Sequence, residues 1–93
     1  MSVPTYIKDQ YPSARQYKSQ SFYTVQIGSN CLYISYNVPI AAAIDGQLFV
    51  TDTKYSVTTS KHLNLAKGME PDALIITATP DYLIEASLPF RGV

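Results

Sequence analysis

Residues 21–51 contain short runs of β-branched and aromatic residues separated by turn signals, and this pattern constrains the fold more than any other feature. Residues 22–27 are followed by Gly28-Ser29-Asn30, after which residues 31–36 resume the same pattern. Asp45-Gly46, a preferred two-residue hairpin turn, separates residues 40–44 from residues 47–51. The sequence therefore predicts an antiparallel meander of three or four strands over residues 21–51.

Residues 37–44 carry two further signals. Proline has no N–H group to donate to a strand ladder, so Pro39 indicates a bulge, an edge strand or the start of a new strand. The three alanines at 41–43 are small, so we expect a helix or a partner's backbone to lie close against this strand.

Residues 52–93 predict helices that alternate with one strand. Residues 56–60 are candidate N-caps for a helix over 59–67, which Gly68 would close in the left-handed conformation. The continuous apolar run 73–78 predicts a buried strand. Thr79 as N-cap and Pro80 as the first helical residue predict a second helix over 80–86, which Pro89 would stop, leaving residues 90–93 as a tail.

The first twenty residues show no dominant period. Pro12 at a first turn would suit a short helix over residues 9–18, whereas an arm that wraps the domain or frays is the alternative. The sequence thus predicts an N-terminal arm over residues 1–20 and a single α+β domain over residues 21–93. We expect a small antiparallel β-meander of three to five strands packed against one or two short helices.

The charge balance restricts the partners. The chain carries 7 Lys and Arg against 7 Asp and Glu, and a net charge of zero argues against a dedicated electrostatic DNA clamp. The distribution is uneven, because residues 1–67 carry +3 and residues 68–93 carry −3. Either these charges simply solvate the fold, or they form a bipolar surface that favours self-association or a polar partner.

Cys31 is the only cysteine, which excludes an intramolecular disulfide and a cysteine-based zinc site. Its strand-like neighbours predict a buried and inert thiol. No apolar run approaches the roughly 18 residues of a membrane span, and the polar N-terminus does not resemble a signal peptide. A reducing cytoplasm is the predicted location, the host cytoplasm if a phage encodes the chain.

No catalytic constellation is visible. Ser56 or Ser60 could be combined with His62 and an acid, but sequence neighbours rarely converge as a triad and there is no Gly-x-Ser-x-Gly motif. One histidine with scattered acids does not supply a metal site, and no phosphate-binding or dinucleotide-binding motif is present. We therefore predict a protein that is not an enzyme and has no cofactor, no metal site and no catalytic residues.

Residues 55–64 concentrate the polar chemistry of the chain around its only histidine. Lys61 and His62 at a helix start oppose the helix dipole, which prefers anions there, and such a start with hydroxyls can receive a phosphate or carboxylate. Thr58, Thr59, Lys61 and His62 are therefore the candidate contact cluster for a partner or an anion. In the alternative interpretation, the hydroxyls satisfy backbone groups and His62 is a hydrogen-bonded core residue.

Binding of single-stranded nucleic acid is the second candidate function. Strand tyrosines can stack on bases, and lysines can contact the backbone. Strand parity places Tyr33 and Tyr36 on opposite faces unless a bulge intervenes, which weakens this candidate. The candidate nucleic-acid contacts are Tyr23, Tyr33, Tyr36, Lys54, Lys61 and Lys67.

Two blocks of the sequence carry a resemblance. Residues 35–41 (Ser-Tyr-Asn-Val-Pro-Ile-Ala) and residues 55–64 (Tyr-Ser-Val-Thr-Thr-Ser-Lys-His-Leu-Asn) resemble a family of small uncharacterised bacteriophage and prophage proteins. That family has a Ser-Tyr-x-x-(aliphatic)-Ala block followed by Tyr-Ser-x-Thr-Thr-x-Lys-His. The likeness covers residues 21–66, and the chain departs from the pattern at Pro39 and at Leu65-Ala66. The resemblance implies a phage-type origin and an αβ mini-domain, and it implies no activity.

The predicted function is that of a small non-enzymatic phage-type accessory protein that binds a host or viral macromolecule. The expected partner is a protein rather than a nucleic acid or a membrane, and self-association is an alternative. A third candidate is a structural oligomer of a viral assembly. Such an oligomer would use the apolar residues 40–44 and the bipolar charge distribution.

Overall fold

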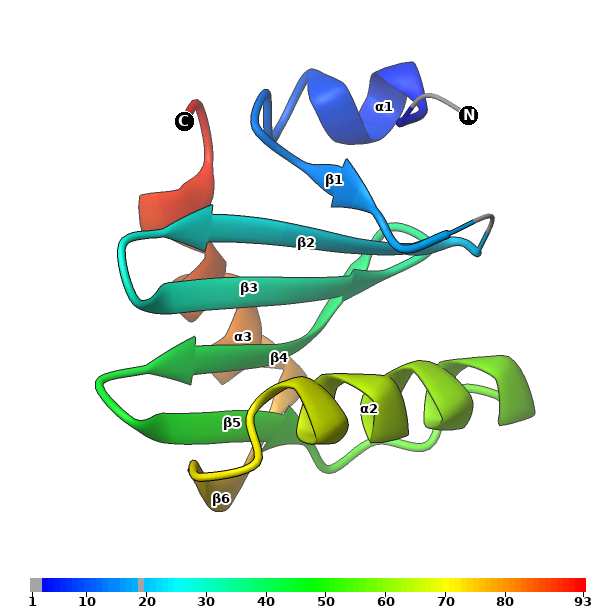
Figure 1. Cartoon of the computed structure of the whole chain (residues 1–93). Coiled ribbons are helices and arrows are strands. Elements are labelled where there is room, and N and C mark those ends of the chain that lie inside the picture. The colour runs from blue at the N-terminus through cyan, green and yellow to red at the C-terminus, as the bar shows by residue number, and fades with distance from the viewer. Residues whose placement is uncertain (1–2, 19) are drawn as a thin grey trace.

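A computed structural model of the chain describes residues 3–18 and 20–93 and has an α+β fold. Within these residues, one six-stranded sheet runs in sequence order from β1 to β6 and carries helices on both faces (Figure 1). The strands are β1 (Arg15–Gln16), β2 (Phe22–Ile27), β3 (Asn30–Ser35), β4 (Val38–Ile44), β5 (Gln47–Thr51) and β6 (Leu74–Ala78). The helices are α1 (Thr5–Lys8), α2 (Val57–Met69), α3 (Pro80–Ser87) and the 3-10 turn η1 (Leu88–Phe90).

The predicted meander over residues 21–51 is confirmed. Strands β2 to β5 pair antiparallel with their sequence neighbours. Asp45 and Gly46 have φ values of 52° and 82°, and positive φ at both central residues is what the twist of a tight hairpin requires. The turn residues therefore fix the register of the β4–β5 hairpin.

Pro39 lies at a β-bulge, one of the alternatives that the sequence left open. Ile34 pairs with Pro39 and Tyr33 pairs with Ala41, so Ile40 is an additional residue in β4. A bulge turns the extra side chain to the same side as its neighbour. Ile40 and Ala41 accordingly belong to the same core cluster, although they are adjacent in a strand.

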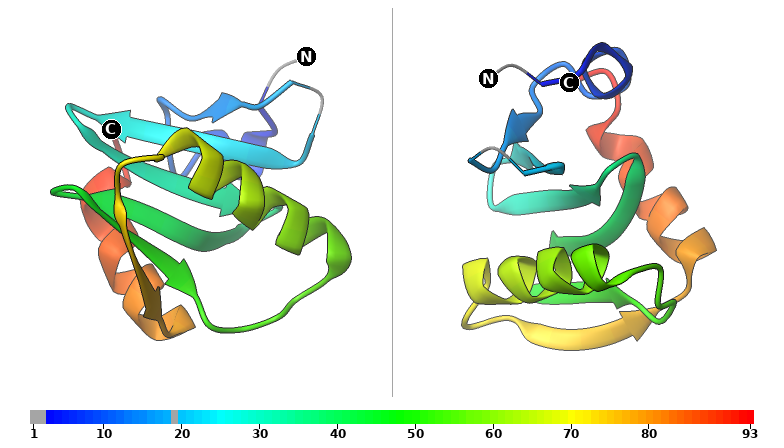
Figure 2. Two further views of the ribbon diagram at one scale, coloured as in Figure 1. Left: turned by 60° about the horizontal axis from the view of Figure 1, so that its bottom comes forward. Right: turned by 90° about the vertical axis from the view of Figure 1, so that its right-hand side faces the viewer.

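The alanines of β4 let helices pack on both faces of the sheet. Ala42 belongs to the core cluster that contains Leu83 of α3, whereas Ala41 and Ala43 belong to the cluster that contains Ala66 of α2. The two helices therefore lie on opposite faces (Figure 2). Residues 40–44 were the predicted assembly surface, and this is wrong, because β4 is paired on both edges and largely buried.

Helix α2 is longer than the sequence indicated. Ser56 is its N-cap and accepts a hydrogen bond from the Thr59 backbone N–H at 3.1 Å, so the helix begins before residue 59. Gly68 lies within the helix and does not have a positive φ, so the predicted left-handed cap at Gly68 is wrong. Thr79 caps α3 and Pro80 is its first residue, as predicted, and Pro89 lies in η1.

Strand β6 forms where the sequence predicted a strand, but its pairing and its exposure to solvent differ from the prediction. It pairs with β5 in parallel, which makes the sheet mixed, and it forms one edge of the sheet. Leu74 and Ile75 are exposed, so the expectation of a buried strand is wrong. Within the described residues, the six strands and three α-helices exceed the three to five strands and one or two helices that the sequence predicted.

Both terminal segments contribute to the core. The helix predicted over residues 9–18 is absent, and α1 and the short β1 stand on either side of the turn residues 9–14. Ile7 and Phe90 are buried in one cluster, and the Ser13 N–H donates to the Val93 carbonyl, so the expected C-terminal tail is wrong. The part of the predicted arm at residues 1, 2 and 19 lies outside the described residues.

Candidate functional site

Helix α2 divides the predicted contact cluster between its two faces. Thr59 and His62, three positions apart, face the sheet and are 7% and 1% exposed, whereas Thr58 and Lys61 are exposed to solvent. The four residues therefore do not form one surface. The role of Thr58 and Lys61 as partner contacts stays a prediction.

A chain of hydroxyl groups connects the start of α2 to the sheet. The Ser56 hydroxyl donates to Thr59 Oγ1 at 3.2 Å, and Thr59 Oγ1 shares a hydrogen bond with Ser35 Oγ at 3.1 Å. Ser35 Oγ in turn lies 2.7 Å from His62 Nδ1 and shares a hydrogen bond with it. We call Ser56, Thr59, Ser35 and His62 the hydroxyl chain. A neutral imidazole with its proton on Nε2 accepts this last bond through Nδ1, and the Ser35 hydroxyl then donates it.

The surroundings of His62 also favour its neutral form. Its ring stacks on Phe22 with centroids 5.1 Å apart, and Tyr36 lies against it at 6.0 Å. Burial lowers the pKa of His62, because the charged form loses solvation. Ser35 is as deeply buried as His62, so a substrate cannot reach this Ser-His pair. The geometry matches a hydrogen-bonded core histidine.

The tyrosines proposed for nucleic-acid stacking do not share a surface. Tyr23 and Tyr33 are each 2% exposed and belong to the core clusters on opposite faces of the sheet. Tyr36 is exposed, beyond the end of β3. Lys54 is exposed in the connection after β5, and Lys67 is half-buried in the last turn of α2. The structure therefore brings no stacking platform together from these residues.

Cys31 and Tyr33 lie beside the end of α2. Burial raises the pKa of Cys31 to about 11, so the thiol is protonated at neutral pH. Burial, and then the hydrogen bond that its hydroxyl donates to Glu70, raise the pKa of Tyr33. This corner links β3 to α2 and supplies no activated nucleophile.

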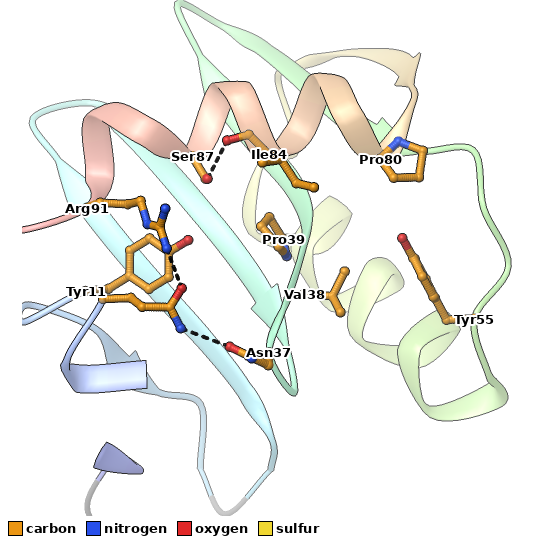
Figure 3. A pocket seen from close by; sticks show the side chains of 10 residues that line it. Tyr11, Asn37, Val38, Pro39, Tyr55, Pro80, Ile84, Ser87 and Arg91 are labelled. Carbon is orange, nitrogen blue, oxygen red and sulfur yellow. Dashed lines mark hydrogen bonds between the residues drawn. The ribbon is translucent and has the colours of Figure 1, made fainter. Parts of the chain in front are cut away.

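The candidate site is a groove on the α3 face of the molecule (Figure 3). It has a volume of about 270 Å³ and is formed by residues from the N-terminal segment, the start of β4, the connection before α2, and α3 with the residues after it. We call it the groove. Its lining residues are Gln10, Tyr11, Asn37, Val38, Pro39, Tyr55, Pro80, Ile84, Ser87 and Arg91.

One wall of the groove is a row of hydrogen-bonded polar side chains. Arg91 Nη2 donates to Gln10 Oε1 at 2.8 Å, and Gln10 Nε2 donates to Asn37 Oδ1 at 3.2 Å (Figure 3). Gln10 Nε2 also donates to the Tyr6 carbonyl at 2.9 Å. Gln10 thus holds Arg91 through an amide oxygen, which leaves the guanidinium charge uncompensated by that partner. The same bonds orient Asn37 so that its carbonyl oxygen points to Gln10.

The opposite part of the groove is apolar. Val38 and Pro39 line it from β4, Pro80 and Ile84 line it from α3, and Tyr55 lies beside Val38 and Pro80 at the end away from Arg91 (Figure 3). Ile84 and Tyr55 are 52% and 43% exposed, although both are large and largely apolar side chains. The groove therefore combines an apolar surface with one cationic group at its other end.

Sequence reasoning missed this groove because its residues come from four distant segments. Gln10 and Arg91 are 81 residues apart, and no local pattern signals that they meet. The sequence did contain one signal for this site. Arg91 is the only basic residue in the otherwise acidic residues 68–93, and Pro89 precedes it by two positions. Tyr55 and Asn37 do lie in the two blocks that carry the resemblance.

The lining of the groove lacks the side chains that most often act as general acids, bases or nucleophiles. Its ten lining residues include no Asp, Glu, His, Lys or Cys, the side chains that most often transfer protons or attack substrates. Across residues 3–18 and 20–93, no three His, Cys, Asp or Glu side chains are grouped as they would be to hold a metal ion. In the same part of the chain, no helix has the length and apolar character needed to cross a bilayer.

A model of a protein family described as "Family of unknown function (DUF8033)" matches residues 5–76. The chain belongs to this family. The match extends from α1 into β6 and so includes the hydroxyl chain and the Gln10, Asn37 and Tyr55 part of the groove. Searches of curated proteins and of solved structures find no match.

Proposed function

We propose that the protein is a small non-enzymatic accessory protein that binds a partner protein in the groove. The observation that carries this proposal is the pairing of Arg91, held by Gln10, with the apolar surface of Tyr55 and Ile84. Such a site accepts an apolar side chain next to a carboxylate, because a guanidinium binds a carboxylate through two parallel hydrogen bonds. The phage-type origin and the cytoplasmic location indicated by the sequence belong to the same proposal.

The dimensions of the groove favour the end of a partner chain as its occupant. Pockets that enclose small molecules usually have volumes of about 300–1,000 Å³, whereas the groove has about 270 Å³ and lies open at the surface. A terminal residue carries an apolar side chain and a carboxylate on neighbouring atoms, and capture of a C-terminal carboxylate is a recurrent mode of peptide recognition. We therefore propose that the groove receives a C-terminal residue with an apolar side chain.

The absence of acid, histidine and cysteine side chains from the lining supports a binding role over a catalytic one. Ser87 does not change this, because its hydroxyl donates to the Ile84 carbonyl within α3. The predicted contacts Thr58 and Lys61 lie on the outer face of α2 and give a separate hypothesis for where the partner binds. The two hypotheses can be distinguished with matched variants.

The test uses a library of displayed peptides with free C-termini, selected against the wild-type protein. We expect the selected peptides to end in an apolar residue and to lose about tenfold or more in affinity when the C-terminus is amidated, since a hydrogen bond to a charged group contributes roughly 1.5–3 kcal/mol. Arg91→Ala should cause a similar loss, and Lys61→Ala should cause none.

The opposite dependence would overturn the proposal. If Lys61→Ala weakens the selected peptides and Arg91→Ala does not, the partner binds at α2, as the sequence predicted. If amidation has no effect, the groove does not recognise a carboxylate. Circular dichroism of each variant, compared with wild type, excludes unfolding as the cause of a loss.

A further inference from the structure

The two edge strands of the sheet differ in how strongly their sequences discourage pairing with another chain. Strand β1 is only two residues long and one of them is the exposed Arg15, and short, charged edge strands discourage pairing with other chains. Strand β6 has five residues, Leu-Ile-Ile-Thr-Ala, with no charge and no proline. It lies at the other end of the sheet, with β5 as its neighbour (Figure 1).

The backbone of β6 presents hydrogen-bonding groups at its outer edge. The Leu74 N–H donates to the Gly46 carbonyl, and the Ala78 carbonyl accepts from the Asp52 N–H, so the groups of residues 74 and 78 point toward β5. Successive residues in a strand alternate in direction. The N–H and carbonyl groups of Ile75 and Thr77 therefore point away from β5, along the free edge.

The side chains at this edge are apolar. Leu74 and Ile75 are 63% and 49% exposed, far more than strand residues in a covered sheet. A hollow of about 270 Å³ adjoins the α3 face of the strand, lined by Phe49, Ile76, Thr77, Ala78, Thr79 and Tyr82. A strand added at this edge would direct every second side chain toward that hollow, which is how strand addition obtains specificity.

The charge around β6 indicates what kind of segment would fit. Residues 68–87 contain four acids, Glu70, Asp72, Asp81 and Glu85, and no Lys or Arg. Asp72 and Asp81 flank the strand on either side and are both exposed. An incoming segment with basic residues at its ends would meet opposite charges at both ends of β6.

The same charges disfavour a second copy of this chain. In a two-fold antiparallel pairing, the start of β6 in one copy would lie near the end of β6 in the other, which brings the Asp72 side of one copy toward the Asp81 side of the other. Like charges that approach each other repel. A basic partner avoids this repulsion.

We propose that the β6 edge binds an extended segment of a partner protein by strand addition, with aliphatic side chains at alternate positions and Lys or Arg at the flanks. This site is independent of the groove, because its contacts come from the backbone of Ile75 and Thr77 and from the hollow. The partner segment continues the sheet as a seventh strand.

The probe is a synthetic heptapeptide, Lys-Val-Thr-Val-Thr-Val-Lys, acetylated and amidated so that it has no carboxylate for the groove. Two comparison peptides carry Glu in place of Lys, or N-methyl groups on alternate residues. We expect the Lys peptide to shift the NMR amide signals of Ile75 and Thr77 and to bind at least severalfold more tightly than the Glu peptide. N-methylation should abolish binding, because it removes the backbone donors.

Three protein variants complete the test. Thr77→Pro removes an outward N–H without removing a bond to β5, so binding should be lost, whereas Thr77→Val keeps that N–H and should bind. Asp72→Lys should reduce the preference for the Lys peptide over the Glu peptide. The N-methylated peptide tests the same bond with the unchanged protein, should Thr77→Pro fail to fold.

Three results would overturn the proposal. The first is equal affinity for the Lys and Glu peptides, and the second is binding of the N-methylated peptide as tightly as the unmodified one. The third is a concentration-dependent dimer of the free protein that Thr77→Pro dissociates, because the edge would then be occupied by a second copy.

Discussion

The hydroxyl chain joins Ser56, Thr59 and His62 to Ser35 of β3, and burial lowers the pKa of His62 at its inner end. Ser35 is 27 residues away from His62, so the sequence of 55–64 alone could not show which of its hydroxyls point inward. The sequence left two interpretations of His62 open, a hydrogen-bonded core residue or a contact for a partner. The period of the helix decides between them, because it determines which positions face the sheet. Positions 59 and 62 face the sheet, and positions 58 and 61 face solvent.

At this scale, the lowered pKa of His62 predicts a dependence of stability on pH. The pKa of His62 is lower in the folded protein than its usual 6.5. Well above pH 6.5, the imidazole is neutral in both the folded and the unfolded protein, so it does not change the free energy of unfolding. As the pH falls below 6.5, the unfolded state binds a proton first, so the free energy of unfolding decreases until the pH passes the folded pKa. Urea denaturation from pH 8 to pH 5 measures this.

His62 is the only histidine, which makes the control simple. His62→Asn keeps an acceptor for Ser35 but does not titrate, so its stability should vary less between pH 6.5 and pH 5 than that of wild type. An equal slope in both proteins would show that another group causes the pH dependence.

The raised pKa of Cys31 predicts slow modification of its thiol. With a pKa of about 11 and a side chain that is 8% exposed, little thiolate is available at pH 7.5. Iodoacetamide should label the folded protein at a small fraction of the rate seen in 6 M guanidinium, as followed by mass spectrometry. Labelling at the same rate in both conditions would mean that Cys31 is accessible in the folded state.

At the scale of elements, the prediction succeeded where a local rule decides the structure. Positive φ at Asp45-Gly46 and the Thr79-Pro80 cap are properties of two to four neighbouring residues, and both were predicted correctly. The start and end of α2 were not, because four of residues 56–60 have side chains that could serve as N-cap, and no local rule selects Ser56 among them. The helix continues through the exposed Gly68 to Met69, and the following Glu70 accepts a hydrogen bond from Tyr33 of β3, a contact that no local pattern indicates.

The choice of Ser56 as N-cap predicts unequal costs for neighbouring serines. Ser56→Ala removes the acceptor for the Thr59 N–H and the first donor of the hydroxyl chain, so the free energy of unfolding should fall by about 1–2 kcal/mol. Ser60 is the matched control: its hydroxyl donates to the Ser56 carbonyl on the exposed side of the same turn. Ser60→Ala should cost roughly 0.5 kcal/mol or less, and equal losses in the two variants would contradict the assignment of the cap.

At the scale of the whole molecule, the contacts between distant segments were beyond the sequence. Ile7, Tyr11 and Phe90 share one core cluster although they lie near opposite ends of the chain. Neither segment has the period of an amphipathic element, since α1 has four residues and η1 has three. Their burial follows from the sheet face they cover, which no local pattern describes.

This arrangement predicts that the C-terminal segment stabilises the fold. Phe90→Ala should lower the free energy of unfolding by roughly 3–5 kcal/mol, because it leaves a cavity among buried side chains. Leu88→Ala is the control, since Leu88 is 49% exposed two positions earlier in the same turn, and it should cost less than about 1 kcal/mol. Thermal and urea denaturation measure both, and a small effect of Phe90→Ala would mean that the C-terminal segment detaches without loss of the core.

The parallel pairing of β6 with β5 also bears on the order in which the chain folds. The strands β2 to β5 join neighbours through short turns, so they can form from contacts that are close in sequence. Strand β6 can pair only after the whole connection from residue 52 to residue 73, including α2, has been closed, and that closure costs chain entropy first. We therefore expect β6 to join the sheet late and to detach before the other strands, which would expose the edge of β5, where Leu48 and Val50 are buried.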